Sequence, residues 1–154
     1  MTDNQDQAKR DLLHLEEQIQ KENDSFKQLR QVCAIYSDVL KVIGAGNATG
    51  VIAAGAALNT FSNQPVLIMF LKVGGVSFLL GVFCFAIGFA LLFSMVVAAS
   101  RIPGAFKRGH TVEFVDYKAD FAISLITPLV RFAEAGAVLF GLGCGCAFII
   151  LIFA

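Results

Sequence analysis

Charge is what this sequence lacks over its two longest stretches. Between Val42 and Ser100 the only Asp, Glu, Lys or Arg is Lys72, and none follows Glu134. Charged residues make up 16% of the 154-residue chain and hydrophobic residues 56%. An ordinary soluble domain has about 25% charged and about 45–50% apolar residues. A soluble protein could not keep such charge-free stretches in water, so the sequence predicts an integral membrane protein.

The motifs of the common enzyme classes are also missing. No GxSxG, P-loop or HExxH occurs, and the two histidines, His14 and His110, lie far apart in the sequence. The few polar residues at membrane depth do not pair as a nucleophile and a base. We therefore expect no catalytic residue and no cofactor, and we do not expect an enzyme.

Binding chemistry is equally sparse. The formal net charge is zero and the basic residues form no soluble basic face, so no nucleic-acid partner is expected. Three of the four cysteines lie in apolar stretches, where cysteine behaves as a small hydrophobe. The pair Cys144-Gly-Cys146 would point about 200° apart on a helix, which is unsuitable for a metal site. The polar first forty residues indicate that no cleavable signal peptide is present.

The segment 1–41 is polar and carries a helical heptad pattern. Residues at alternating steps of three and four are apolar from Leu12 to Ile43, with Glu22 as the one exception. Such a seam predicts a coiled-coil or amphipathic arm that packs on another copy or on a cytoplasmic protein. Two alternatives stay open: Asn23-Asp24-Ser25 could cap a second helix, or the arm could lie on the membrane surface. The seam consists of Leu12, Leu15, Ile19, Glu22, Phe26, Leu29, Cys33, Tyr36, Leu40 and Ile43.

The first predicted span, 42–61, consists largely of small residues. Small side chains gain little from burial in lipid, so other helices are expected to surround this one. Gly46 and Gly50 form a GxxxG pair, which lets helix backbones approach closely. Asn47 is costly in hydrocarbon without a partner. Two interpretations are open for it: a pore-facing or interchain hydrogen bond, or a bond to a backbone carbonyl within one chain.

The second predicted span is the apolar run 65–100, which follows the uncharged link 59–65. As one helix it would be about 52 Å long, against a hydrocarbon core of about 30 Å. Lys72 is expected to reach the interface, or else to line a pore mouth. Small residues at alternating steps of three and four predict one close packing seam. That seam consists of Gly74, Ser77, Gly81, Cys84 and Gly88.

Charge returns in the segment 101–134. The pattern there predicts a turn at Pro103-Gly104, an amphipathic helix from Thr111 to Ile126 and a break at Thr127-Pro128. The third span is expected at 135–154. A ridge of small residues at four-residue steps predicts a further close helix contact on this span. The ridge consists of Ala133, Ala137, Gly141 and Gly145.

Eleven of the twelve lysines and arginines fall on one side of a three-span chain, six before the first span and five within 101–134. The positive-inside rule therefore predicts a cytoplasmic N-terminus, an outer 59–65 link and an outer C-terminus in a bacterial-type inner membrane. The expected fold class is an all-α integral membrane protein with three transmembrane helices. A cytoplasmic helical arm precedes the spans, and a cytoplasmic amphipathic helix lies between the second and third.

The small-residue ridges lead us to expect a homo-oligomer, because one copy of so small a bundle hides only part of them from lipid. Three functional hypotheses follow. The oligomer could be a pore, a channel or a membrane-perturbing effector, as in antiviral (phage) defence. It could instead be a non-conducting anchor or scaffold that recruits a cytoplasmic protein through 1–41. A holin-like lysis protein is the third and weaker hypothesis, because the chain carries no basic C-terminal tail.

Overall fold

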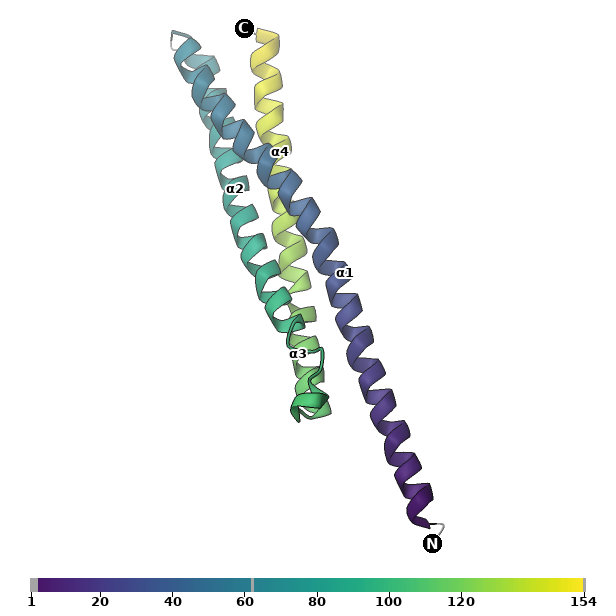
Figure 1. The fold of residues 1–154 in the computed structure, drawn as a ribbon. Coiled ribbons are helices and arrows are strands. Elements are labelled where there is room, and N and C mark those ends of the chain that lie inside the picture. Colours follow the sequence, from purple (N-terminus) through teal and green to yellow (C-terminus); the bar gives the residue numbers. More distant parts are fainter. Residues whose placement is uncertain (1–2, 62, 154) are drawn as a thin grey trace. The chain divides into compact units, whose positions relative to one another are not determined.

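The computed structural model describes residues 3–61 and 63–153. Across these residues the chain is all-helical, with 91% helix and no strand. The elements are α1 (Asp3–Thr60), α2 (Pro65–Ala99), the 3-10 helix η1 (Phe106–Arg108), α3 (Val112–Ser124) and α4 (Ile126–Phe153) (Figure 1). Three helical stretches are long and apolar enough to cross a membrane, which confirms the expected all-helical class with three candidate spans.

The expected arm and the first span form one helix. α1 runs for 58 residues without a break, so the alternative of two helices joined at Asn23-Asp24-Ser25 is wrong. The capping side chain is used on the helix surface instead: Asp24 accepts a hydrogen bond from Gln20 at 3.3 Å and lies 3.9 Å from the Lys27 ammonium. Met1 and Thr2 of the expected arm, and Ala154 of the expected third span, lie outside the described residues.

The last helix begins earlier than the expected third span. α4 starts at Ile126, so Thr127-Pro128 occupies its first turn and does not separate two elements. Proline is tolerated there because its missing N–H would have no partner within the helix. Leu125 alone separates α3 from α4.

The described helices contribute to two compact units. The first, which we call the arm unit, combines α1 up to Ala34 with Phe93–Ile126. The second, which we call the span unit, combines Ile35–Leu92 with α4 from Thr127 onward. Each unit is described separately below.

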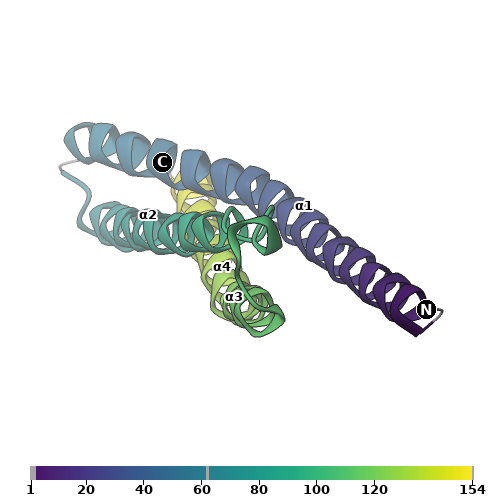
Figure 2. The ribbon, with the colours of Figure 1, turned by 60° about the horizontal axis from the view of Figure 1, so that its bottom comes forward.

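In the span unit, α2 lies alongside the second half of α1, and α4 packs against both (Figures 1 and 2). Leu40 and Leu129 are fully buried there. A further apolar cluster lies at the end of the unit that holds the turn between α1 and α2. Its buried members are Leu67, Leu71 and Ile150.

In the arm unit, small side chains of α2 and α3 enclose Leu29 of α1. The connection after α2 turns tightly at Gly104 and Gly109, whose φ angles of +72° and +79° favour glycine. Thr111 caps the start of α3, and its Oγ1 accepts a hydrogen bond from the Phe114 N–H at 3.4 Å. The buried cluster consists of Leu29, Ala98, Ala99, Ile102, Ala105, Val115, Ala119 and Ala122.

Candidate functional site

The most deeply buried polar side chain among the described residues is Asn47 of α1, which is 0% exposed. Its Nδ2 donates to the Ile43 carbonyl at 2.9 Å and to the Gly136 carbonyl of α4 at 3.3 Å. Of the two interpretations left open by the sequence, the structure shows the bond within one chain. Its Oδ1 has no hydrogen-bond partner among the described residues and lies against Gly81 of α2, where a Cβ would collide with it. One amide thus ties α1 to α4 and requires glycine on α2.

Phe78 of α2 fills the space that two glycines on the other helices leave open. A Cβ on Gly50 of α1 or on Gly143 of α4 would collide with its ring. The side chain is only 6% exposed, and its ring packs tilted against Phe140 with the centroids 5.9 Å apart. Because all three helices meet at this ring, glycine at 50 and at 143 sets how closely they approach.

The same pairing of a glycine with a large side chain or a neighbouring helix recurs along the span unit. A Cβ on Gly74 would lie 3.1 Å from the Cys146 Cβ, and one on Gly136 would lie 3.1 Å from Ile43 Cγ2. Each contact would tighten if a methyl group were added. The other glycine–side chain pairs are Gly44 with Phe85, Gly46 with Phe140 and Gly88 with Leu40.

On α1 and α2, the small residues singled out in the sequence lie at helix contacts within the chain. Gly46, Gly50, Gly74, Gly81 and Gly88 all face a side chain of another helix. Ser77 is buried, and its Oγ donates to the Val73 carbonyl at 2.9 Å. Cys84 is half-buried, with its Cβ 3.7 Å from the Cβ position of Gly136.

The small-residue ridge expected on α4 is mostly exposed, unlike the small residues on α1 and α2. Ala137, Gly141 and Gly145 are exposed, and a Cβ on either glycine has nothing within 4 Å. In the part of the chain that the structure describes, Ala133 is the one buried member of this ridge, so a role of the other three between copies stays a prediction. Sequence reasoning missed Gly136 and Gly143, which are buried and do make the contacts.

The signal for the buried face of α4 is present in the sequence. The face follows a seven-residue repeat, with steps of four, three, seven and seven, whereas the expected ridge has steps of four. Leu129 and Ile150 stand at its two ends and small residues lie between them, so a search for small residues at regular steps of four does not find it. The buried residues of α4 are Leu129, Ala133, Gly136, Gly143 and Ile150.

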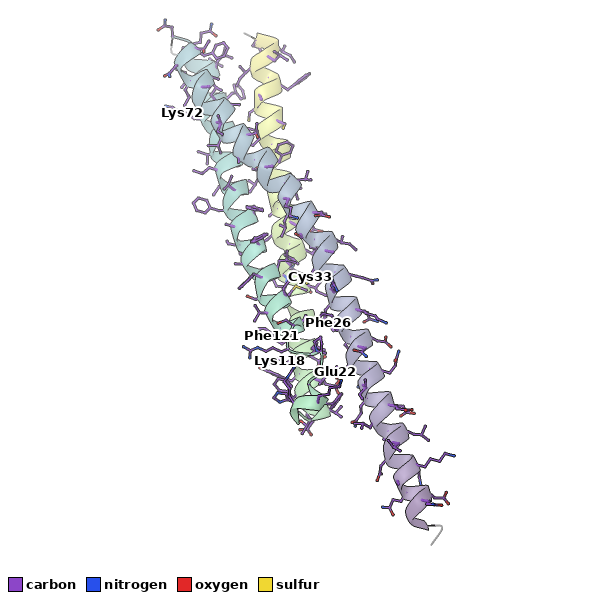
Figure 3. All side chains as sticks on the ribbon, viewed as in Figure 1. Glu22, Phe26, Cys33, Lys72, Lys118 and Phe121 are labelled. Atoms are coloured by element: carbon purple, nitrogen blue, oxygen red, sulfur yellow. The ribbon has the colours of Figure 1, made fainter. Side chains whose placement is uncertain are left out.

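An apolar cavity of about 310 Å³ lies in the span unit, next to the Phe78 ring. Small residues of α1 and α4, among them Ala53, Ala54 and Ala147, form much of its wall. Lys72, the lone charge of this region, is exposed on α2 (Figure 3).

In the arm unit, Glu22 explains why the heptad seam is interrupted. Its carboxylate is buried, with the residue 3% exposed, and accepts a hydrogen bond from the Ala105 backbone N–H (Figure 3). The Lys21 ammonium lies 3.2 Å from the Asp116 carboxylate of α3. Burial raises the pKa of the Cys33 thiol above its ordinary value. The seam from Glu22 to Leu29 therefore packs against the chain's own α2–α3 segment.

The N-terminal half of the seam has no such cover. Leu12 is 61% exposed, and Leu15 and Ile19 are exposed as well. In Figure 1 the N-terminal end of α1 extends beyond α3, the element against which the following part of the arm packs. This half of the seam is an apolar helix face without a partner inside the arm unit.

The described part of the chain offers no ready metal site. Its four cysteines are free, and residues 3–61 and 63–153 hold no group of three or more His, Cys, Asp or Glu side chains that could bind a metal ion.

The protein is all-helical, with three candidate membrane spans. Its candidate functional features are the close helix contacts, the buried Asn47 amide and the exposed helix faces. No protein-family model, no curated protein and no solved structure matches the chain.

Proposed function

We propose that the chain is a homo-oligomeric integral membrane protein whose copies meet along the outer face of α1 and form a pore or a membrane-perturbing assembly. The observation that carries this proposal is a contrast between two exposed helix faces in the span unit. Both faces belong to helices that are long and apolar enough to cross a membrane.

The outer face of α2 consists of large apolar side chains, which suits contact with lipid. Exposed members of this face include Val73, Val76, Leu79, Leu80 and Phe83. The outer face of α1 is small and partly polar, and it offers little area for lipid contact. Its exposed members include Ala45, Ala48, Thr49, Ile52, Ala56 and Asn59. A second copy covers such a face better than acyl chains do, because small residues let backbones approach closely.

A water path in this assembly would lie between copies. Inside the span unit, Phe78, Leu40 and Asn47 pack between the three helices, and the cavity beside Phe78 has an apolar lining. Thr49 lies on the outer α1 face, with its Oγ1 donating to the Ala45 carbonyl at 2.9 Å. That bond satisfies the hydroxyl proton in a dry contact and leaves the oxygen able to accept from water in a wet one.

Cysteine accessibility tests the pore. In a chain whose native cysteines are replaced by serine, Thr49→Cys on the α1 face is compared with Val76→Cys on the α2 face. Ion flux through liposomes carrying Thr49→Cys should fall on treatment with a membrane-impermeant thiol reagent. Flux through liposomes carrying Val76→Cys should not change, because that thiol faces lipid. Absence of flux from both, before any reagent is added, would refute a pore and leave the anchor function described next.

The exposed half of the arm seam favours a second candidate function, a membrane anchor that recruits a cytoplasmic protein. Leu12, Leu15 and Ile19 form an apolar stripe that a helix of another protein could cover. Affinity purification of the full chain should recover a defined partner. A variant with serine at all three positions should lose it, while serine at the exposed polar positions Gln5, Gln7 and Gln20 should not. Recovery of the chain alone in every case would contradict recruitment.

The proposed orientation places the N-terminus and the 101–134 segment in the cytoplasm and the C-terminus on the outer side of a bacterial-type inner membrane. Eleven of the twelve lysines and arginines then lie on the cytoplasmic side. Fusion of a reporter that is active only outside the cytoplasm should give signal at the C-terminus and none at the N-terminus. The reverse pattern would overturn the orientation.

A further inference from the structure

A groove in the arm unit combines apolar and cationic side chains at the end of the long apolar run of α2. The groove has a volume of about 340 Å³ and lies between the last turns of α2 and one side of α3. Phe93 and Val97 of α2 and Phe121 of α3 form its apolar wall. Arg101 and Lys118 line it as well. Both Phe93, which is 64% exposed, and Phe121 are open to the surroundings.

The place of Arg101 in the sequence sets the depth of the groove in a membrane. Arg101 is the first charged residue after Lys72, so it marks the point at which the apolar run of α2 ends. Tyr117, an exposed aromatic side chain in contact with Lys118, is typical of the boundary between hydrocarbon and water. The apolar wall of the groove therefore continues into the hydrocarbon, and its two cations lie at the level of the lipid headgroups.

The two cations of the groove are not neutralised by carboxylates. The ion pairs of the described residues engage Lys21, Lys27, Lys41 and His14, and none involves Arg101 or Lys118. Lys118 has no acidic residue one helical turn before or after it; Phe114, Val115, Phe121 and Ala122 occupy those positions.

Neighbouring groups hold the cations on this side of the unit. The Lys118 ammonium lies 5.3 Å from the centre of the Tyr117 ring and 5.7 Å from that of Phe114, which positions its charge without cancelling it. Arg108 Nη2 donates to the Arg101 carbonyl at 2.7 Å, so a third cation approaches the same turn. Figure 3 shows Lys118 and Phe121 on the side of α3 away from Glu22 and Phe26 of the arm.

We infer that this groove binds one anionic phospholipid, with its phosphate between Arg101 and Lys118 and an acyl chain along Phe93 and Val97. A soluble anion would match the two cations but would leave the apolar wall uncovered. A zwitterionic lipid would cover the wall but would bring its own cation to Arg101 and Lys118. An anionic phospholipid satisfies both parts of the groove, as basic pockets at the membrane boundary do in general. The site requires that α2 cross a membrane, and it does not depend on a pore or on contacts between copies.

The test measures lipid binding to the full chain in detergent micelles by native mass spectrometry, with phosphatidylglycerol and phosphatidylcholine added in separate titrations. Arg101→Gln/Lys118→Gln removes both cations of the groove. Lys9→Gln/Lys107→Gln is the matched control, since it removes two exposed cations that do not line the groove. Val97→Trp keeps the charges and fills the apolar wall.

Wild-type chain should retain one phosphatidylglycerol and prefer it to phosphatidylcholine. Each groove cation should contribute about fivefold to that affinity, so Arg101→Gln/Lys118→Gln should bind about thirtyfold more weakly, while the control double variant should change little. Val97→Trp should also weaken binding, and excess inorganic phosphate should not displace the lipid.

Equal losses in the two double variants would overturn the site, because they would show a general charge effect. Displacement by inorganic phosphate, or equal affinity for both lipids, would overturn the assignment to an anionic phospholipid. Circular dichroism of each variant should match that of the wild-type chain; if that of Arg101→Gln/Lys118→Gln does not, Val97→Trp decides the outcome.

Discussion

Gly143→Ala and Gly141→Ala make the same chemical change on the same helix and are expected to differ in stability. A Cβ on Gly143 lies 2.5 Å from the Phe78 ring, whereas one on Gly141 has nothing within 4 Å. Alanine gains about 1 kcal/mol of helix propensity over glycine at both positions, so this term cancels in the comparison. Overpacking a filled contact costs about 1–3 kcal/mol. Gly143→Ala should therefore unfold with a free energy about 1–3 kcal/mol below that of Gly141→Ala.

The free energy of unfolding can be measured by titrating the full chain in lipid–detergent micelles with a denaturing detergent and following the loss of helix. Both variants alter α4 by one methyl group, so they share any effect on insertion. Phe78→Leu should recover part of the loss in the Gly143→Ala background, because the smaller side chain leaves room for the methyl group. Equal stability of Gly143→Ala and Gly141→Ala would refute the packing of three helices around Phe78.

The remaining predictions concern the buried side chains of Asn47 and Glu22 and the thiol of Cys33, which lies on the same helix as both. Asn47→Ala should lower the free energy of unfolding by about 0.6–1.7 kcal/mol, the range of hydrogen bonds between helices in membranes. Gly81→Ala should cost less in the Asn47→Ala background than in the wild-type chain, which a double-mutant cycle measures; additive losses would contradict the contact. Glu22→Ala leaves the buried Ala105 N–H without its acceptor, so it should destabilise the arm unit by about 1–3 kcal/mol and speed amide exchange at Ala105, whereas Glu22→Gln should do less. The raised pKa of Cys33 means that its alkylation should be slow at neutral pH and accelerate above the pH at which a free thiol ionises. Glu22→Ala should shift that profile to lower pH, and an unchanged profile would show that Glu22 does not hold the arm unit closed.

The distribution of charge was enough to predict three helical stretches that are long and apolar enough to cross a membrane, because a helix in lipid cannot carry unpaired charges cheaply. The residues at the start of α2 and α3 also made these two helix starts predictable from the sequence. Pro65 begins α2, and Thr111 caps α3 with its side-chain oxygen. These signals depend on a few neighbouring residues and on the solvent, which the sequence alone describes well.

Signals that depend on contacts between distant segments were not predictable. Asn23-Asp24-Ser25 has the composition of a helix cap, but α1 continues through it. Glu22 interrupts an apolar seam, and its partner is a backbone N–H 83 residues away.

The buried face of α4 also depends on contacts between segments that are distant in the sequence. Four glycines lie from Gly136 to Gly145, both included; of these, Gly136 turns toward Ile43 of α1 and Gly143 toward the Phe78 ring of α2. The glycine-rich composition predicted that this helix packs closely against other helices. Which of its residues make the contacts depends on the positions of the neighbouring helices.

The most direct test of the account is the number of copies in one assembly within a lipid bilayer. Chains carrying one fluorophore each, reconstituted into liposomes at low protein density, can be counted by stepwise photobleaching. The contrast between the small, polar face of α1 and the large, apolar face of α2 predicts several steps per assembly. It also predicts that Ala48→Phe, on the α1 face, reduces the step count, whereas Leu79→Phe, on the α2 face, does not. A single step in the wild-type chain would contradict the account, because the outer face of α1 would then face lipid alone.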